Sequence, residues 1–187
     1  MINFDAKAMN QNWTLFLDRD GIINERIVGG YVKKSSQFIF RPDFLEAIFR
    51  LRSLFGKVCV VTNQQGIGKG LMTDEDVLQV HHYMINELQK RSIMIDGVYV
   101  CPHLESDDCS CRKPKTGLAL QAKKDFPDID FHSSLMIGDS ASDIFFGKNC
   151  GMRTALVSQE TNLPLCHPDY QAANLMDIID LLIKNNL

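Results

Sequence analysis

The sequence predicts an α/β protein built on a doubly wound, mostly parallel β-sheet. Short apolar runs, of the kind that form strands buried on both faces, recur along the chain. They alternate with longer segments in which apolar residues return at helical spacing, and this alternation is typical of β-α-β units. At 187 residues and 45% hydrophobic, the chain is long enough for one good core and short for two. We therefore expect a single domain over residues 1–187.

The strands are expected where several apolar residues follow one another and a turn signal comes next. They cover residues 15–17, 58–61, 98–100, 135–137 and 154–157. A short extended piece is expected at residues 38–40, where Pro42 ends it. Gly21 follows the first strand closely and lets the backbone turn where a side chain would crowd it.

The helices are expected at residues 43–55, 73–91, 117–126, 140–151 and 175–183. In the first of them Leu45 and Ile48 begin a series of apolar residues at helical spacing, and Gly56 is a fitting stop. Thr73 has the character of an N-cap for the second helix. Asp76, three residues later, forms a weak relative of the capping box.

Charge and composition argue against several classes of function. A formal charge of -3 and a pI near 5.9 disfavour general binding to nucleic acid or to an anionic membrane. No apolar run reaches membrane-spanning length, and the first residues lack the basic start and apolar stretch of a signal peptide. We therefore expect a cytoplasmic protein without nucleic-acid or membrane partners. One core accounts for the apolar pattern, so we also expect a monomer.

Polar residues follow four of the predicted strands. In open α/β sheets ligands collect beyond the carboxyl ends of the strands, so these residues are expected to meet at one edge. Asp18 and Asp20 stand one residue apart, and two such carboxylates repel each other unless a cation, a proton or a role in chemistry separates them. The full set is Asp18, Asp20, Thr62, Asn63, Arg112, Lys113, Asp139 and Asp143.

This combination of side chains suits phosphate chemistry. Carboxylates are good ligands for a hard cation such as Mg²⁺, and a hydroxyl, an amide and cationic side chains suit a phosphate. An aspartate beside Mg²⁺ can attack phosphorus and form an aspartyl-phosphate, which divides a hard hydrolysis into two steps. A second aspartate can protonate the leaving oxygen and later activate water. A lysine and Mg²⁺ would offset the charge of the transition state.

Four motifs, in this order, resemble those of the haloacid dehalogenase-like phosphatases. They are Asp18-Arg19-Asp20-Gly21, Thr62-Asn63, Lys113 and the run Gly138-Asp139-Ser140-Ala141-Ser142-Asp143, and they span about residues 13–157. The resemblance implies that Asp18 is the nucleophile and Asp20 the general acid/base. It also implies that Thr62 holds the phosphoryl group and that Lys113 links nucleophile and phosphate. One departure is Ile22, where the family usually has threonine, and it removes a local hydroxyl.

The same resemblance implies a magnesium site and a Rossmann-like haloacid dehalogenase fold. Asp18, Asp139 and the backbone carbonyl of Asp20 would bind Mg²⁺. Asp143 would support the site, either as a ligand itself or through a neighbouring ligand.

Residues 101–111 place three thiols and one imidazole in a short loop, from Cys101, His103, Cys109 and Cys111. The cytosol keeps thiols reduced, so this cluster indicates a metal before disulfides. Three sulfurs and one nitrogen make a closed tetrahedral Zn²⁺ site of the structural type. We expect this zinc to stiffen the loop that delivers Arg112 and Lys113.

The remaining cysteines and the paired histidines carry weaker signals. Cys59, Cys150 and Cys166 are most simply small apolar residues. His81 and His82 fall in the middle of a predicted helix, away from the strand ends, so we expect ordinary core or surface roles for both.

The zinc loop followed by Arg112-Lys113-Pro114 narrows the resemblance to a branch without a cap domain. That branch holds the D-glycero-D-manno-heptose 1,7-bisphosphate 7-phosphatases and the histidinol-phosphate phosphatases. Gly30-Tyr31-Val32 and the run from Thr62 to Gly70 resemble the heptose enzymes. The short spacing from His103 to Cys109 resembles the histidinol enzymes at least as much. We favour the heptose enzymes, because the length of a zinc loop concerns scaffolding.

The resemblance to this branch also implies a small phosphorylated metabolite as the partner. Arg112 would bind its far polar groups or its second phosphate, and Asn63 is a further candidate for substrate binding. Residues 25–34 are candidates for contact with the sugar.

Three other functions are open on the sequence. A doubly wound domain with clustered aspartates could be a phospho-accepting receiver, but a receiver has no need of a leaving-group acid such as Asp20. A nucleic-acid 3′-phosphatase is disfavoured by the acidic balance and the absence of a basic stripe. A zinc-stapled binding module is disfavoured because every catalytic position is filled.

Overall fold

The computed structural model describes residues 12–159 and 166–185, in which strands alternate with helices along the chain. The strands are β1 (Thr14–Leu17), β2 (Lys57–Asn63), β3 (Gly97–Cys101), β4 (Ser134–Gly138), β5 (Arg153–Val157) and β6 (Tyr170–Ala172). The helices are α1 (Pro42–Leu54), α2 (Asp74–Gln89), α3 (Gly117–Asp125), α4 (Ala141–Cys150) and α5 (Leu175–Lys184). Three-residue turns of 3-10 helix lie at Ser35–Gln37, Glu105–Asp107 and Phe131–Ser133.

The six strands form one sheet in the order β3-β2-β1-β4-β5-β6, and each neighbouring pair is parallel. The predicted doubly wound parallel sheet is confirmed. The sequence did not predict β6, because its three residues, Tyr-Gln-Ala, contain no apolar run and lie at the exposed edge of the sheet. The short extended piece predicted at residues 38–40 lies outside the sheet: Phe38 has extended backbone angles and Phe40 makes an isolated bridge with Asn24.

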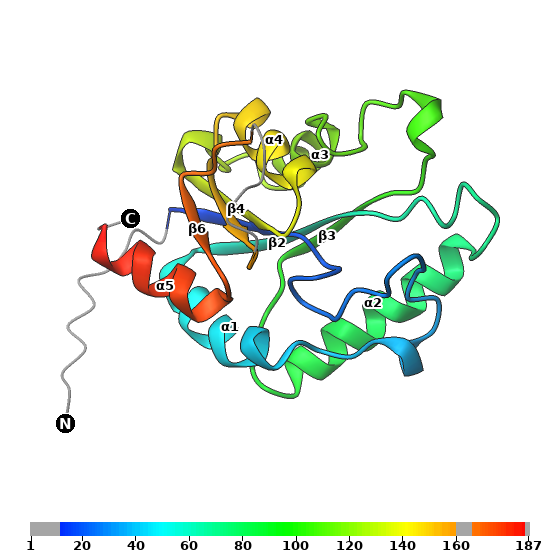
Figure 1. Cartoon of the computed structure of the whole chain (residues 1–187), viewed down its shortest axis with the longest axis horizontal. Coiled ribbons are helices and arrows are strands. Elements are labelled where there is room, and N and C mark those ends of the chain that lie inside the picture. The colour runs from blue at the N-terminus through cyan, green and yellow to red at the C-terminus, as the bar shows by residue number, and fades with distance from the viewer. Residues whose placement is uncertain (1–11, 160–165, 186–187) are drawn as a thin grey trace.

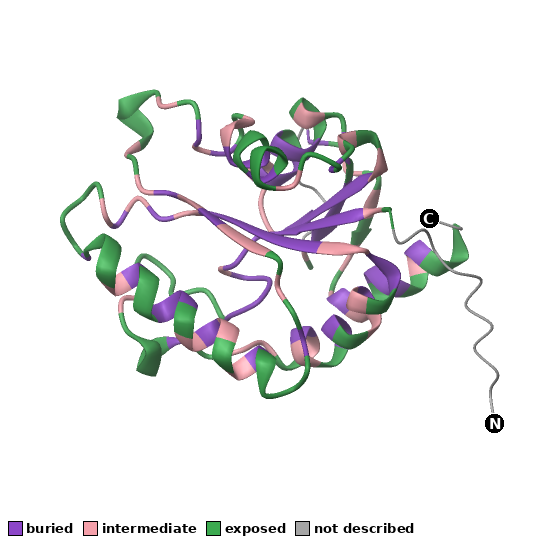
Figure 2. Ribbon diagram, turned by 180° about the vertical axis from the view of Figure 1, so that it is seen from behind, coloured by how far each residue is buried: buried purple, intermediate pink, exposed green. Residues whose placement is uncertain are grey.

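Alternate residues of the central strands enter two different hydrophobic clusters, one on each face of the sheet. Leu15 and Leu17 of β1 pack into a cluster with residues of α1, α2 and α5. Phe16, between them, packs into a second cluster with residues of α3 and α4. Figure 1 shows the same division of helices, and Figure 2 shows the strands between them as the most buried part of the chain. Burial of each such side chain stabilises the fold by roughly 1.5–3 kcal/mol.

The helix ends follow the local signals in the sequence. At the start of α2 the Thr73 hydroxyl accepts a hydrogen bond from the Asp76 N–H at 3.1 Å, and the Asp76 carboxylate accepts one from the Thr73 N–H at 2.8 Å. The predicted capping box is therefore confirmed. Helix α4 ends before Gly151, whose φ of 80° lies in the left-handed region that glycine adopts without steric cost.

The order of the strands places β1 at the point where the winding reverses, between β2 and β4. Ligands bind at such points, outside the carboxyl ends of the strands. In the described residues, the segment joining β1 to α1 contains no element longer than the turn Ser35–Gln37, and the segment joining β2 to α2 contains none. Neither of these two connections therefore contains a cap domain over this edge of the sheet. None of the helices in residues 12–159 and 166–185 has the length and apolar character needed to cross a membrane.

Candidate active site

A buried ion-pair array lies at the carboxyl end of β1. The Asp18 N–H still donates to Ile137 of β4 at 3.0 Å, so the sheet holds this residue in place. Its carboxylate accepts a hydrogen bond from Lys113 Nζ at 2.7 Å, and the same ammonium lies 2.6 Å from Asp143 Oδ1 and donates to the Val61 carbonyl at 2.8 Å. All three charged side chains are buried. Although burial disfavours the ammonium, the two carboxylates hold the pKa of Lys113 above its usual value.

Two glycines give the carboxylates room to meet. A Cβ on Gly21 would lie 1.9 Å from Asp139 Oδ2, and the φ of Gly21 is 97°, which an L side chain rarely adopts. A Cβ on Gly138 would lie 2.2 Å from the Cβ of Asp143. Side chains at these positions would therefore displace Asp139 or Asp143.

Asp18, Asp139 and Asp143 offer oxygen atoms that all lie within 4.8 Å of one another. Burial raises the pKa of Asp18 to about 7, and the charges of Asp143 and Asp139 add to this effect. Burial also raises the pKa of Asp139 to about 6, although Arg26 opposes the shift. Carboxylates crowded in this way are stabilised by a cation, so the donor set fits a divalent metal with oxygen ligands.

Arg26 contacts two of the oxygen atoms that the sequence analysis assigned to Mg²⁺. Its Nη2 donates to Asp139 Oδ1 at 2.7 Å and to the backbone carbonyl of Asp20 at 3.3 Å. The Arg26 side chain is 50% exposed, so it can move aside at little cost. A cationic nitrogen at this point is a second sign that the oxygens suit a cation. Sequence reasoning placed Arg26 only within a loop of sugar-contact candidates, and no local signal indicated its contact with Asp139.

The Asp20 side chain lies outside the group formed by Asp18, Asp139 and Asp143, and it is held by three other side chains. Arg19 Nη2 donates to both Asp20 oxygens, at 3.0 and 2.9 Å. Asn24 donates to Oδ1 at 2.9 Å and Gln64 donates to Oδ2 at 2.7 Å. Although burial alone would raise it, Arg19 and these hydrogen bonds hold the pKa of Asp20 below its usual value. The predicted metal contact of Asp20 was through its backbone carbonyl, so the metal site does not require its side chain.

Two residues to which the sequence analysis assigned no chemical role belong to this environment. Gln64 is buried and its amide donates to Thr62 Oγ1 at 2.8 Å as well as to Asp20. His81 of α2 is also buried, and its Nε2 lies 2.9 Å from Arg19 Nη1. The expectation that His81 lies away from the strand ends is therefore wrong, whereas its neighbour His82 is exposed. Only the packing of α2 against the segment that follows β1, which contains Arg19, reveals this contact.

A small cavity of about 80 Å³ is lined by Asp18, Asp20, Thr62, Lys113 and Asp143, together with four neighbours. Asn63 is one of those neighbours, and its side chain holds the backbone of Lys113. The Asn63 amide donates to the Lys113 carbonyl at 3.1 Å and its oxygen accepts from the Lys113 N–H at 3.0 Å. The cavity thus brings predicted residues from all four strand ends around one point.

A larger cavity of about 480 Å³ adjoins the small one and shares Asp20, Arg26 and Asn63 with it. This volume lies within the usual range of small-molecule sites. Lys69 and Arg112 add two further cations to its wall. A buried nitrogen of Arg112, Nη1, has no hydrogen-bond partner among the described residues, so it is available to an anionic group of a ligand.

The four predicted zinc ligands lie together. The three sulfur atoms, of Cys101, Cys109 and Cys111, are 3.0 to 3.6 Å apart. His103 Nδ1 lies 3.7 Å from the sulfur of Cys101 and 3.2 Å from that of Cys111. Sulfurs bound to one tetrahedral zinc at about 2.3 Å would be about 3.8 Å apart, so this cluster needs only small shifts to fit the ion.

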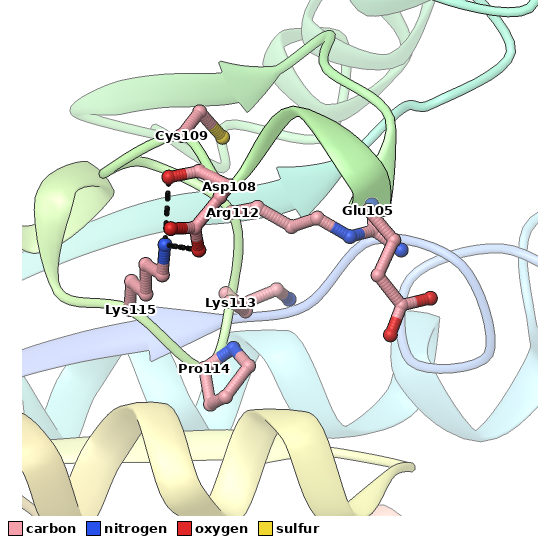
Figure 3. Close-up of a pocket in the computed structure, with 7 residues that line it drawn as sticks. All are labelled: Glu105, Asp108, Cys109, Arg112, Lys113, Pro114 and Lys115. Carbon is pink, nitrogen blue, oxygen red and sulfur yellow. Dashed lines mark hydrogen bonds and ion pairs between the residues drawn. The ribbon is translucent and has the colours of Figure 1, made fainter.

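The far side of this loop borders a third cavity, of about 210 Å³, which Figure 3 shows. Lys115 donates to the Asp108 carbonyl at 2.8 Å and pairs with the Asp108 carboxylate. This contact holds the two ends of the segment 108–115 together. Arg112 and Lys113 follow the cysteine cluster directly, and Arg112 lines both this cavity and the 480 Å³ one. The conformation of the loop at residues 101–111 therefore determines where the side chains of Arg112 and Lys113 lie.

Comparison with known proteins identifies the family. A model described as HAD-hydrolase-like matches residues 110–178. The D-glycero-alpha-D-manno-heptose-1,7-bisphosphate 7-phosphatase of Mycobacterium tuberculosis (strain H37Rv) is 42% identical over 144 residues, which are 77% of this chain and 76% of that protein. The beta-named enzyme of Helicobacter pylori (strain 26695) is 39% identical over 175 residues, 93% of this chain and 99% of that protein.

The fold has close counterparts among solved structures. The D,D-heptose 1,7-bisphosphate phosphatase from B. bronchiseptica, crystallised with magnesium and phosphate, matches with a TM-score of 0.79 and 27% identity. The match covers 92% of this chain and 98% of that one. The sequence similarity, the fold and the grouping of polar residues at the switch point all indicate the same family. The chain therefore belongs to the haloacid dehalogenase-like phosphatases, in the family that includes these heptose-bisphosphate phosphatases.

Proposed function

We propose that this phosphatase removes the 7-phosphate of a D-glycero-D-manno-heptose 1,7-bisphosphate through an aspartyl-phosphate on Asp18. The observation that carries the proposal is the meeting of Asp18, Lys113 and Asp20 around one small cavity at the mouth of a larger one. The small cavity suits a single phosphoryl group and the larger one suits the rest of a sugar phosphate. The names of the relatives support the choice of substrate.

In the first step, a carboxylate oxygen of Asp18 forms a bond to phosphorus while the bond between phosphorus and the sugar oxygen breaks. Asp20 gives its proton to that oxygen, so the sugar leaves as an alcohol. The pKa of Asp20 is low without substrate, but an anionic phosphate beside it would raise that pKa and favour the acid form. The positive charge of Lys113 offsets the charge of the phosphoryl group, and the hydroxyl of Thr62 donates to a phosphoryl oxygen. Because Gln64 donates to Thr62 Oγ1, the hydroxyl proton of Thr62 remains free for the phosphate.

In the second step, water attacks the phosphorus of the aspartyl-phosphate. Asp20, now a carboxylate, takes a proton from that water, and the bond from phosphorus to Asp18 breaks. Inorganic phosphate leaves and Asp18 is restored. The low pKa of Asp20 favours its role as the base in this step.

We propose that Asp18, Asp139 and the Asp20 carbonyl hold Mg²⁺, with Asp143 in support. Bound Mg²⁺ would neutralise the phosphoryl charge and remove the repulsion between Asp18 and the incoming phosphate. The raised pKa values of Asp18 and Asp139 and the contacts of Arg26 support a cation at this point. Arg26 would then be free to turn into the larger cavity.

We also propose a structural Zn²⁺ on Cys101, His103, Cys109 and Cys111. The short distances among their ligand atoms support this assignment. Because four protein ligands leave no open position, this ion takes no part in the chemistry.

We propose that the second phosphate of the substrate lies in the 480 Å³ cavity. Arg26, Lys69 and Arg112 contribute positive charge to its wall, and Lys69 Nζ donates to the Tyr31 hydroxyl at 3.1 Å. The unpartnered nitrogen of Arg112 supports a contact with an anionic group. A substrate with two phosphates would use more of this charge than histidinol phosphate, which has one.

The substrate is tested by measuring phosphate release with Mg²⁺ from the α and β anomers of the heptose bisphosphate and from histidinol phosphate. We expect kcat/KM for one heptose anomer to exceed that for histidinol phosphate by at least about 100-fold, since each cationic contact to the second phosphate is worth about 1.5–3 kcal/mol. The relatives include both alpha-named and beta-named enzymes, so the assay also decides the anomer. A preference for histidinol phosphate would overturn the substrate and indicate that the short zinc loop was the better guide.

Magnesium binding should stabilise the protein more at high pH than at low pH. The pKa values of Asp18 and Asp139 are raised in the folded protein to about 7 and about 6. Without metal, the folded state therefore binds more protons than the unfolded state between about pH 4 and 7, and stability falls as pH rises through this window. Mg²⁺ binds the ionised carboxylates and removes this loss.

We expect saturating Mg²⁺ to raise Tm by about 5–10 °C at pH 8 and by much less at pH 5. Magnesium should be removed by buffer exchange, because a chelator would also attack the cysteine cluster. An equal rise in Tm at both pH values would contradict the assignment of Asp18 and Asp139 as ligands.

A further inference from the structure

We propose that His81 is a positioning residue for the phosphatase reaction, which acts through Arg19 to hold the Asp20 carboxylate in place. The inference rests on the proposed role of Asp20 as the acid that protonates the leaving oxygen. His81 lies on α2, outside the four strand-end motifs, and no chemical role was expected for it.

The first observation is a continuous chain of buried contacts. His81 Nε2 lies 2.9 Å from Arg19 Nη1, and Arg19 Nη2 lies 3.0 and 2.9 Å from the two oxygens of Asp20. The Arg19 side chain is fully buried and His81 is 5% exposed. The Asp20 side chain is 23% exposed and lines both cavities of the active site, so this chain of contacts ends at the chemistry.

The second observation is the direction of the hydrogen bonds. A guanidinium has only donors, so His81 must accept at Nε2 and carry its proton on Nδ1. Burial and the charge of Arg19 lower the pKa of His81 to about 3, which keeps the ring neutral. A neutral acceptor can orient the guanidinium without competing with Asp20 for its charge. A carboxylate at position 81 would draw Arg19 away, and a lysine would repel it.

The third observation is the balance of contacts on Asp20. Asn24 and Gln64 approach the two oxygens separately, at 2.9 and 2.7 Å, whereas Arg19 alone contacts both. Arg19 is the partner whose position fixes the plane of the carboxylate. The Nε of Arg19 has no hydrogen-bond partner among the described residues, so His81 and Asp20 are the side chains that determine where the guanidinium lies.

A purely structural role for the pair predicts a different behaviour. A buried guanidinium is costly, and loss of its partner could simply destabilise the fold. In that case His81→Leu would lower activity toward all phosphate esters alike. A positioning role predicts a loss only where the leaving group needs a proton. Leucine should be tolerated in the fold because the apolar residues Val77 and Ile85 line the same cavity as His81.

The test compares kcat/KM on two esters, using the magnesium-loaded protein. One ester is an alkyl phosphate, chosen as the substrate with the highest kcat/KM among the two heptose bisphosphate anomers and histidinol phosphate. Its alkoxide needs a proton to leave. The other is 4-nitrophenyl phosphate, whose phenolate leaves without one. For His81→Leu we expect a loss of about 10–100-fold on the alkyl ester and of less than about threefold on the nitrophenyl ester. His81→Gln restores an acceptor near the position of Nε2, and we expect it to recover most of the alkyl activity. His82→Leu, on the exposed neighbour, is the matched control and should change neither value.

Asp20→Asn separates this proposal from the function on which it rests. We expect it to show the same dependence on the leaving group, with a larger loss, and adding His81→Leu to it should cause no further loss. Equal losses on both esters for His81→Leu, or no loss, would overturn the positioning role while an ester-dependent Asp20→Asn leaves the acid role standing. Equal losses for Asp20→Asn would overturn both. Should the leucine variant fail to fold, His81→Asn, which is too short to reach Arg19, takes its place against His81→Gln.

Discussion

Replacing Asp18 with asparagine is expected to lower kcat by at least about 10⁴-fold while the protein remains folded. The amide has the shape of the carboxylate but cannot form the covalent bond to phosphorus. The buried Lys113 keeps a partner in this variant, because Asp143 lies 2.6 Å from its Nζ. Phosphate release and thermal melting on the same sample check both parts of the prediction.

The stability of Asp18→Asn gives a further check. Burial raises the pKa of Asp18 to about 7, which means that an ionised carboxylate at this place costs free energy in the metal-free protein. We therefore expect the metal-free variant to melt no lower than the wild type at pH 8. Asp128→Asn is the matched control, since Asp128 is exposed and pairs with Lys57 on another part of the surface. Residual kcat within tenfold of wild type would exclude Asp18 as the nucleophile.

Replacing Cys109 with serine is expected to remove bound zinc and to lower Tm by about 10 °C or more. Structural zinc contributes directly to folding, because the ligands are not held together in the unfolded chain. Cys109 is the best of the three thiols to test, since it is only half-buried and its loss creates little cavity. Zinc content per chain, Tm and kcat are measured together.

The control for this variant is Cys150→Ser. Cys150 is also half-buried but stands at the end of α4, outside the cluster. We expect it to keep its zinc and to melt close to the wild type. Because the loop delivers Arg112 and Lys113, activity should fall with zinc in Cys109→Ser. An unchanged zinc content and Tm in Cys109→Ser would contradict a structural metal site.

Most of the candidate site could be predicted because parallel strands share one direction. In such a sheet the carboxyl ends of all strands lie at the same edge, so Asp18, Thr62 and Asp139 could be grouped from the strand ends alone. The cysteine cluster could be predicted for a different reason. Its four ligands fall within residues 101–111, and short spacing brings them together whatever the rest of the fold does.

The spacing of apolar residues along the strands and helices was also sufficient to predict a hydrophobic core on both faces of the sheet. Leu15, Phe16 and Leu17 alternate between the two clusters, as a strand buried on both faces requires. The edge strand β6 was not predicted, because three residues at an exposed edge of the sheet need no apolar run. Patterns in sequence report burial, and an element that buries little leaves little pattern.

The contacts that orient the reacting groups were decided by the tertiary structure alone. His81 and Arg19 are 62 positions apart, and Arg26 and Asp139 are 113 apart. The first contact depends on how α2 packs against the segment that follows β1, and the second on how that segment packs against the end of β4. The sequence by itself determined which chemical groups gather at the edge of the sheet, because strand direction places them there. Only the folded chain decided which buried neighbour holds each group, because hydrogen bonds of this kind act over about 3 Å and have no period along the sequence.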